Sequence, residues 1–322
     1  MDSALMPDPL VSIVLPVFNA ATYLREAVDS MLAQSLTDFE LIAVDDGSTD
    51  NSLALLQYLA TTDNRIRILS RPNTGIVGAL NDGIAISRGE FIARMDADDY
   101  SHPLRLEKQL HFLQTHPDHV AVGCEFYYIG SRGEFLIRSS RIQDPAAIEA
   151  RLLLGDGGTL IHPSVLFRAA AIKQVGAYRQ EAIWIEDLDL YLRLAQIGKL
   201  ANLPEALFWY RLHEGSVNFT KNAGRLERKL RIMEEAWKCR GLEFSPDKLL
   251  PTQFNTAFTP ETCLDFAIAG LSFGKQGRPW YWMRRSFQAA PANKRTWHTL
   301  SYLLQAKVGR IRIPQLHPES DL

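Results

Sequence analysis

The sequence contains few cysteines and no long apolar run. Three cysteines occur among 322 residues, and they are widely spaced. They form no CxxC pair or Cys/His cluster, so a disulfide framework and a cysteine zinc site are excluded and a reducing compartment is favoured. No run approaches the roughly 18 apolar residues that a membrane-spanning helix needs. The first ten residues also lack the basic and apolar regions of a secretory signal, and we therefore expect a cytoplasmic protein.

An excess of one charge is missing as well. Lysine and arginine number 35 against 37 aspartates and glutamates, for a formal net charge of −2. Because the chain has no overall positive electrostatic field, we expect no nucleic-acid partner. The glycines form neither GxGxxG after the first predicted strand nor GxxxxGK(S/T), which argues against a Rossmann dinucleotide site and a P-loop. The length predicts one large domain or two.

The first hundred residues alternate short β-branched runs with segments of helical periodicity. This alternation is typical of βαβ units and a mainly parallel sheet, and so of an α/β fold. Strands are predicted at 11–17, 40–44, 65–69 and 90–95, and helices at 23–36, 53–59, 75–87 and 104–113.

The pattern changes after about residue 119, where we expect the antiparallel half of a mixed sheet to begin. Strands are predicted at 119–129, 134–138, 161–168 and 207–212, helices at 144–154 and 186–197, and a flexible loop at 155–159. Beyond residue 218 the recognisable stretches are helical, at 225–239, 260–273 and 280–289. We predict a mixed, mainly parallel central sheet flanked by helices in residues 1–218, followed by a helical subdomain in residues 219–322.

Three polar turns follow predicted strands: Pro16–Asn19, Asp45–Ser48 and Met95–Asp99. The carboxyl ends of parallel strands meet at one edge of an open α/β sheet, and ligands bind there. Clustered carboxylates at this edge need a cation or hydrogen-bond donors to offset their repulsion. Carboxylate oxygens suit Mg²⁺ or Mn²⁺, and the spacing Asp96-x-Asp98 fits a metal bound together with substrate phosphates.

Each turn on its own has a simpler explanation. A lone DxD pair occurs by chance in many proteins, and Asp45-Asp46-Gly47 is also a common helix-capping turn. Pro16 and Asn19 commonly end strands. The order of all three turns along one predicted edge is what favours a binding site.

Six sequence blocks extend this pattern. They are, in order, VSIVLPVFNA, FELIAVDDGSTDNS, RPNTGIVGALNDGIAISRGEFIARMDADD, HPSVLFR, WIEDLDL and YRLHEGSVN. In sequence and spacing the chain resembles the family 2 glycosyltransferases of the GT-A fold over residues 10–218. The continuation MDADDYSHPLRLEKQLHFL is similar to a bacterial subgroup associated with surface-polysaccharide and lipopolysaccharide assembly. The resemblance implies a catalytic domain at 1–218, with a donor half at about 10–100 and an acceptor half at about 119–218.

The resemblance also implies a reaction and residue roles. It implies an inverting transfer of a sugar from a nucleotide donor, most commonly a UDP-sugar, to a hydroxyl of a glycan or lipid-linked acceptor in cell-surface polysaccharide biosynthesis. The nucleobase would be held by Pro16, Phe18, Asn19 and Asp46, the ribose by Asp96, and Mn²⁺ or Mg²⁺ by Asp98 with His213. Asp187 would be the general base, supported by Glu186.

Several of these assignments have alternatives. Carboxylates such as Glu186 and Asp187 also suit the positive end of a helix dipole, and His213 also suits a partly buried structural histidine. Relatives often have arginine immediately before the asparagine of the third helix, where this chain has Leu80-Asn81. From their places in the sequence, Arg71 and Arg94 are candidates to contact the nucleotide-sugar donor instead. For Arg94, a structural ion pair is an equally good explanation.

Other functions remain compatible with parts of the pattern. A nucleotidyltransferase also uses acidic turns with Mg²⁺, but PVFNAATYL lacks the Gly-rich, basic loop that such enzymes usually have. A non-catalytic sugar-nucleotide-binding protein would be expected to lack the metal or base carboxylate, and both Asp98 and Asp187 are present. A glycosidase's paired carboxylates would not come with a nucleotide site.

Residues 275–322 are basic and aromatic. They contain nine lysines and arginines against Glu319 and Asp321, interleaved with six aromatic side chains. This composition is typical of segments at anionic membrane surfaces, and equally of aromatic side chains that pack on a domain beside solvated charges. A peripheral contact with the inner face of the cytoplasmic membrane is therefore one of two hypotheses for this segment.

Overall fold

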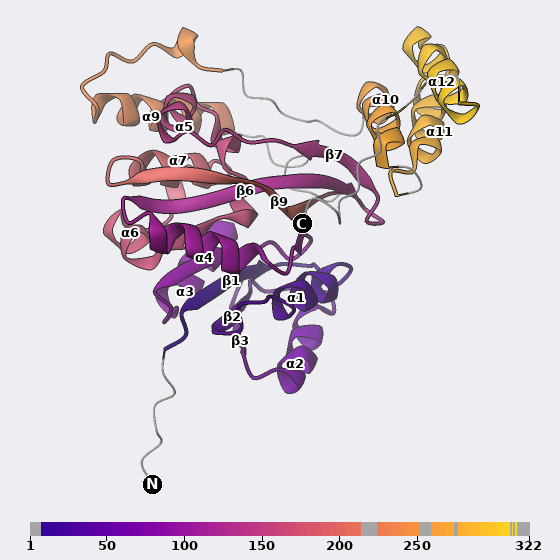
Figure 1. The fold of residues 1–322 in the computed structure, drawn as a ribbon. Helices are drawn as coiled ribbons and strands as arrows, with labels where there is room; N and C mark the ends of the chain where they lie inside the picture. Colours follow the sequence, from indigo (N-terminus) through magenta and orange to yellow (C-terminus); the bar gives the residue numbers. More distant parts are fainter. Residues whose placement is uncertain are drawn as a thin grey trace. The chain divides into compact units, whose positions relative to one another are not determined.

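Nine β-strands form one mixed sheet in the computed structural model, which describes residues 8–213, 224–250, 259–273, 276–309, 311 and 313 (Figure 1). The order across the sheet is β3-β2-β1-β4-β8-β6-β9-β5, and β7 pairs with β6. The strands are β1 (Val11–Val17), β2 (Phe39–Asp45), β3 (Ile66–Ser70), β4 (Phe91–Arg94), β5 (Tyr100–Ser101), β6 (His119–Gly130), β7 (Phe135–Ser139), β8 (Leu166–Arg168) and β9 (Lys199–Leu212).

The parallel half of the sheet is built around β1. This strand pairs in parallel with β2 and with β4, and β2 pairs in parallel with β3. Every residue of β1 and β2 is buried, which is why both strands are mainly apolar rather than alternating. Two of their polar residues bond to each other, since the Ser12 hydroxyl donates to Glu40 Oε1 at 2.7 Å. The carboxyl ends of these parallel strands share one edge, and the polar turns predicted from the sequence follow them there.

The antiparallel half begins at β8. This strand pairs antiparallel with both β4 and β6, and β6 forms an antiparallel pair with β7. The predicted change from a parallel to an antiparallel arrangement is therefore confirmed, as is the mixed α/β fold.

Helices cover the sheet. α3 (Ile76–Ala85) packs on β1 and β2, and Gly83 comes so close that an added Cβ would lie 2.5 Å from Cγ1 of Val14. The other helices are α1 (Leu24–Leu32), α2 (Ser52–Thr62), α4 (Arg105–Thr115), α5 (Pro145–Leu153), α6 (Ala169–Gln174), α7 (Glu186–Leu194), α9 (Arg225–Lys238), α10 (Pro260–Ala269), α11 (Pro279–Ala289) and α12 (Lys294–Lys307).

The described residues fall into two compact units. The first contains those of Met1–Cys124, Arg141–Phe208 and Ala223–Thr252, and the second those of Glu125–Ser140, Trp209–Asn222 and Gln253–Leu322. The core of the second unit includes Leu264, Trp282 and Leu303, contributed by α10, α11 and α12. α9 belongs to the first unit, whereas the sequence places it after a boundary at residue 218. That boundary and the donor and acceptor halves stay predictions.

Some predicted elements differ in extent. The strand expected at 161–168 is only β8, because His162–Ser164 forms a 3₁₀ turn and Pro163 has no N–H to donate to a sheet ladder. The loop expected at 155–159 contains a 3₁₀ turn at Gly157–Thr159. The prediction missed β5 and α6, which are too short to show a period, and α12, although the residues of α12 lie within the predicted helical subdomain.

No helix within the described ranges combines the length and the apolar character that crossing a membrane requires.

Candidate active site

Asn19 joins the loop after β1 to the turn after β2. Its Oδ1 accepts hydrogen bonds from the backbone N–H groups of Thr49 at 2.8 Å and Asp50 at 3.3 Å, and its own N–H donates to Ser48 Oγ at 3.1 Å. The backbone of Asn19 has a φ of 50°, a left-handed conformation that asparagine tolerates better than most residues. The two turns that the sequence predicts at one edge are therefore bonded directly to each other.

Pro16 lies inside β1 rather than in the turn after it. The carbonyl oxygen of Val14 accepts from the N–H of Met95 on the β4 side, and that of Val17 accepts from the N–H of Asp46 on the β2 side. Residues two apart along a strand bond to the same side, so Pro16 shares the side of Val14. The nitrogen of Pro16 therefore faces the β4 side beyond Arg94, where β4 has ended and no N–H is needed. Phe18, two residues later, leaves 53% of its surface exposed at this edge.

Asp46 holds the loop that leads into α3. Its carboxylate accepts from the backbone N–H groups of Thr74 at 3.0 Å and Gly75 at 2.8 Å. Arg71 places Nε 3.5 Å from Asp46 Oδ1 and Nη1 2.6 Å from Asp82 Oδ2. The structure thus shows Asp46 and Arg71 side by side at the end of β2, in an arrangement that fixes the loop.

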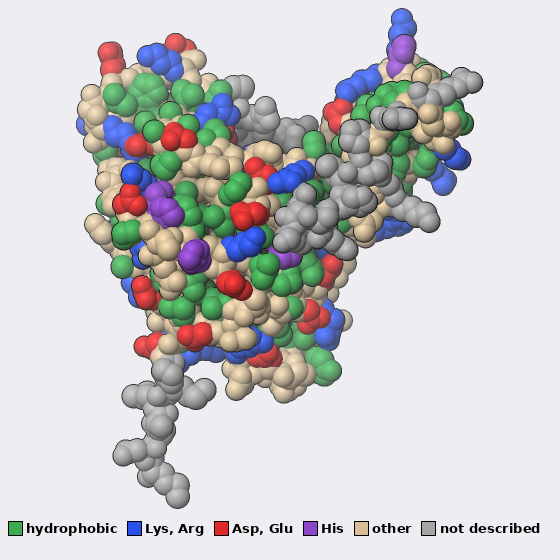
Figure 2. Space-filling view, viewed as in Figure 1, with side chains coloured by type: hydrophobic (Ala, Val, Ile, Leu, Met, Phe, Trp, Pro, Cys, Tyr) green, Lys and Arg blue, Asp and Glu red, His purple; other side chains and the backbone are tan. Residues whose placement is uncertain are grey.

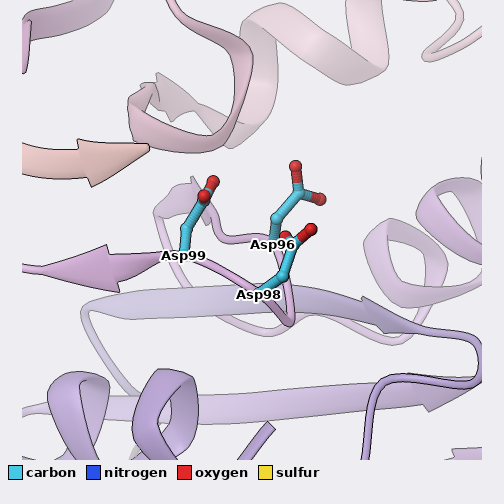
Figure 3. A group of neighbouring side chains, drawn as sticks. All are labelled: Asp96, Asp98 and Asp99. Carbon is cyan, nitrogen blue, oxygen red and sulfur yellow. The ribbon is translucent and has the colours of Figure 1, made fainter. Parts of the chain in front are cut away.

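The loop after β4 brings three carboxylates together. Asp96, Asp98 and Asp99 each offer an oxygen, and these oxygens all lie within 4.8 Å of one another. Figure 3 shows the three side chains extending to the same side of the loop. Asp99 is buried, while Asp96 and Asp98 are partly buried. Oxygen donors gathered this closely suit a hard divalent cation such as Mg²⁺ or Mn²⁺.

Arg94 forms an ion pair with Asp96 at the end of β4. Burial raises the pKa of Asp96, the Arg94 guanidinium opposes that rise, and the neighbouring Asp98 carboxylate adds to it. The charge of Arg94 also acts on Glu186 and Asp187. The ion pair considered for Arg94 is therefore present, and the same guanidinium also acts on the predicted base.

Glu186 and Asp187 begin α7. Oδ1 of Asp187 accepts from the N–H of Leu188 at 2.7 Å, and a Cβ added to Gly157 would lie 3.4 Å from the same oxygen. Burial raises the pKa of Asp187, and the bond from Leu188 only partly offsets this rise. The glycine-containing segment predicted as a flexible loop therefore forms one wall around the Asp187 carboxylate.

Glu186 is expected to destabilise the folded protein at neutral and alkaline pH. Burial, together with the nearby Asp187, raises its pKa from 4.5 to about 7. Between those values the folded state keeps a proton that the unfolded state has lost, so the stability of the fold falls as the pH rises through this window. Replacing Glu186 with glutamine removes this effect. In thermal unfolding, E186Q should raise Tm by about 2–4 °C at pH 8 and leave it unchanged at pH 4. An equal shift at both pH values would contradict this account.

Asp189, in the same acidic stretch, has a structural role. It is fully buried, its Oδ1 accepts from Arg179 Nε at 3.0 Å and its Oδ2 accepts from Arg193 Nε at 3.1 Å. D189N should lower the free energy of unfolding by about 2–3 kcal/mol, because two partly exposed arginines lose their common counter-ion. Urea unfolding measures this change. The control E181Q removes an exposed carboxylate 3.9 Å from Arg179 and should cost less than about 0.5 kcal/mol; equal losses would refute the assignment.

The sequence assigned no role to His162, Tyr178 or Asn81. The charges of Glu186, Asp187 and Asp96 act on the Tyr178 hydroxyl, and the other two residues bond to Tyr178. Nε2 of His162 is 2.6 Å from the Tyr178 hydroxyl, and burial followed by the charge of Arg94 lowers the pKa of His162. Asn81 donates to the Tyr178 carbonyl oxygen at 2.8 Å and accepts from its N–H at 3.0 Å. His162 belongs to the quoted HPSVLFR block, but its partner lies 16 residues away and no motif marks it.

His213 lies in the second unit, directly after β9. The rest of its sequence block, 214–218, is outside the described residues. The metal-binding role suggested for His213 therefore stays a prediction.

Protein comparisons identify a family. The family model described as glycosyl transferase family 2 matches residues 12–176, just over half of the chain. A putative glycosyltransferase, EpsE, from Bacillus subtilis is 34% identical over 220 residues, which cover 67% of this chain and 77% of that protein. A hyaluronan synthase from Pasteurella multocida is 26% identical over 76% of this chain and 24% of its own length.

Solved structures agree on the fold. S. aureus TarS (residues 1–349) in complex with UDP-GlcNAc aligns with a TM-score of 0.60 and 17% identity, covering 92% of this chain and 81% of that one. A mannosyltransferase from Pyrobaculum calidifontis, in complex with GDP-Man and Mn²⁺, aligns with a TM-score of 0.53 and 16% identity over 95% of this chain and 81% of that one. The fold is that of the GT-A glycosyltransferases, and the chain belongs to glycosyl transferase family 2.

Proposed function

We propose that this glycosyltransferase inverts the anomeric centre of its donor sugar and that Asp187 is the general base. The supporting observation is the placement of Asp187. Its carboxylate lies at the start of α7 and packs beside Gly157, and burial raises its pKa. A carboxylate of raised pKa is a stronger base towards a hydroxyl proton than an ordinary aspartate. Glu186, next to it in the chain, is proposed to support it; the Asp187 carboxylate adds to the burial that raises the pKa of Glu186.

The donor is a nucleotide sugar, and we propose a UDP-sugar. The edge formed by Pro16, Phe18, Asn19 and Asp46, with Arg71 beside it, would hold the nucleobase, and Asp96 the ribose. Phe18 offers an exposed ring next to hydrogen-bonding groups, as binding a flat heterocycle requires. The solved TarS complex with UDP-GlcNAc shows that a related fold binds such a donor.

A divalent cation is the cofactor that the acidic loop fits best. Three carboxylates within 4.8 Å of one another supply a donor set of hard oxygens, and Asp98 would hold Mn²⁺ or Mg²⁺ together with its neighbours and His213. Such an ion, when bound, neutralises the charge that develops on a departing diphosphate. The mannosyltransferase of related fold was solved with Mn²⁺.

The reaction follows from these positions. Asp187 takes the proton of an acceptor hydroxyl as that oxygen forms a bond to the anomeric carbon. The bond from the anomeric carbon to the diphosphate oxygen breaks on the opposite face, and its electron pair leaves with the nucleoside diphosphate. Attack from the face opposite the leaving group inverts the configuration, so an α-linked donor gives a β-linked product.

The acceptor is a hydroxyl of a glycan or a lipid-linked glycan in cell-surface polysaccharide assembly, on the cytoplasmic side of the membrane. The names of relatives, which include a hyaluronan synthase, support a polysaccharide acceptor. Membership of the family favours sugar transfer over the nucleotidyltransferase and non-catalytic alternatives.

A thermal-shift screen tests the donor. The wild-type chain is heated with UDP, GDP or dTDP sugars, each with and without Mn²⁺. At a concentration about 100 times its Kd, a UDP-sugar with Mn²⁺ should raise Tm by about 5–10 °C, because the ligand binds only the folded state. A larger Tm shift with a GDP-sugar would contradict the proposed donor. A Tm shift that does not depend on Mn²⁺ would contradict the proposed cofactor. Transfer with the best donor, followed by NMR of the product's anomeric proton, then tests inversion.

A further inference from the structure

α11 and α12 form an antiparallel pair that aromatic contacts close at both ends. At one end, Nζ of Lys307 lies 5.6 Å from the centre of the Trp280 ring. At the other end, the rings of Phe287 and Trp297 meet edge to face with their centroids 5.0 Å apart. The start of α11 is therefore beside the end of α12, and the end of α11 is beside the start of α12.

One face of this pair packs on α10. Trp282, Met283 and Leu303 are buried there in the same cluster as Cys263 and Leu264. This packing accounts for part of the aromatic content of the C-terminal segment, as one of the two sequence hypotheses expects. Phe287 and Leu300 are partly buried against the same cluster, whereas Trp280, Trp297 and Leu304 stay exposed on the adjacent face.

The adjacent face exposes large apolar side chains at helical spacing. Trp280, Arg284 and Phe287 recur along α11, and Trp297, Leu300 and Leu304 along α12, so each set lies on one side of its helix. An open hollow of about 410 Å³ runs between the helices, lined by Trp280, Met283, Arg284, Phe287, Gln288 and Leu300. Trp297 is 53% exposed and Leu304 48%, a costly arrangement in water for side chains of this size.

The charge on the pair has one sign. Residues 279–309 contain five lysines and arginines and no acidic residue. Of these five, Arg295 is paired with Asp265 of α10, whereas Arg284 and Lys307 are exposed next to Trp280. Figure 2 shows hydrophobic and basic side chains together on the part of the chain that Figure 1 labels α10 to α12. Lys275, Arg310 and Arg312, which the sequence adds to this charge, lie outside the described residues.

We propose that this face of α11 and α12 docks on an anionic phospholipid bilayer. Tryptophan and leucine side chains enter the boundary between headgroups and acyl chains, and lysines and arginines beside them meet lipid phosphates. Exposed tryptophans distinguish this occupant from a soluble polyanion, which would need the cations but not the apolar surface. The surface lies within the second unit and does not depend on the identity of the sugar donor.

Vesicle co-sedimentation of the full chain tests this surface. Vesicles of phosphatidylcholine alone are compared with an equimolar mixture of phosphatidylcholine and phosphatidylglycerol. We expect partitioning at least about tenfold stronger with the anionic vesicles, weakening as salt is raised. The double variants R284Q/K307Q and W280A/W297A should each lower it about tenfold or more.

A matched control removes two exposed lysines from the first unit, in K173Q/K238Q, and should bind vesicles like the wild type. All variants must keep the wild-type thermal shift with the best nucleotide sugar, which shows that the first unit is folded, and wild-type helix content by circular dichroism. Equal partitioning of R284Q/K307Q and the wild type would overturn the proposal, as would equal binding to neutral vesicles. Binding of the wild type to dextran sulfate without vesicle binding would overturn it in favour of an anionic polymer.

Discussion

Replacing Asp187 with asparagine is expected to slow sugar transfer by about 10²–10⁴-fold, the usual contribution of a general base. Asparagine has nearly the same shape, so it fits beside Gly157 and can still accept the Leu188 N–H. It cannot take a proton from an acceptor hydroxyl. The expected result is therefore a fall in kcat with little change in the affinity for the donor.

Two measurements separate these effects. Release of nucleoside diphosphate in the presence of acceptor gives kcat, and the thermal shift with donor and Mn²⁺ reports donor binding. E181Q, which neutralises an exposed carboxylate before α7, is the control and should keep wild-type kcat. Near-wild-type transfer by D187N would remove Asp187 from the role of base.

The second large effect is expected for Asp98→Ala. Removing one carboxylate from the Asp96–Asp98–Asp99 group weakens the proposed metal site. A metal ion contributes several kcal/mol of charge stabilisation in the transition state, so turnover should fall by about 10³-fold or more. D98A should also need far more Mn²⁺ for its residual activity, because the remaining ligands bind the ion less tightly.

Chelation provides the parallel test. Turnover of the wild type should disappear in EDTA and return with added Mn²⁺, and direct Mn²⁺ titration should show weaker binding to D98A. D118N, which alters an exposed aspartate paired with Lys199, should behave like the wild type in both assays. Full turnover of the wild type in EDTA would show that transfer does not require the metal.

The sequence predicted best the parts of the fold that are both local and fully buried. β1 has the predicted ends: a strand covered on both faces is almost entirely apolar, here apart from Ser12, and the polar turn that begins at Asn19 follows soon after its last residue. The Asp96-x-Asp98 turn was predictable for a similar reason, since the spacing of residues within one short loop already places their carboxylates together.

The remainder of the site depends on long-range packing. Nothing in the sequence places Gly157 against Asp187, or Asn81 against the backbone of Tyr178, 97 residues further along the chain. Nor does the WIEDLDL block distinguish its carboxylates: Asp189 is neutralised by two arginines, whereas Asp187 faces the segment around Gly157. The helix geometry sends neighbouring residues in different directions, and only the folded chain shows which of them meets an arginine.

The hydrogen bonds that the Asn19 side chain accepts have a thermodynamic consequence for ligand binding. Because its amide oxygen already accepts from Thr49 and Asp50, the loops after β1 and β2 are ordered before any donor arrives. The conformational entropy of these loops is thus lost during folding, and the donor does not have to order them again. Replacing this asparagine with alanine would transfer that entropic cost to the binding step.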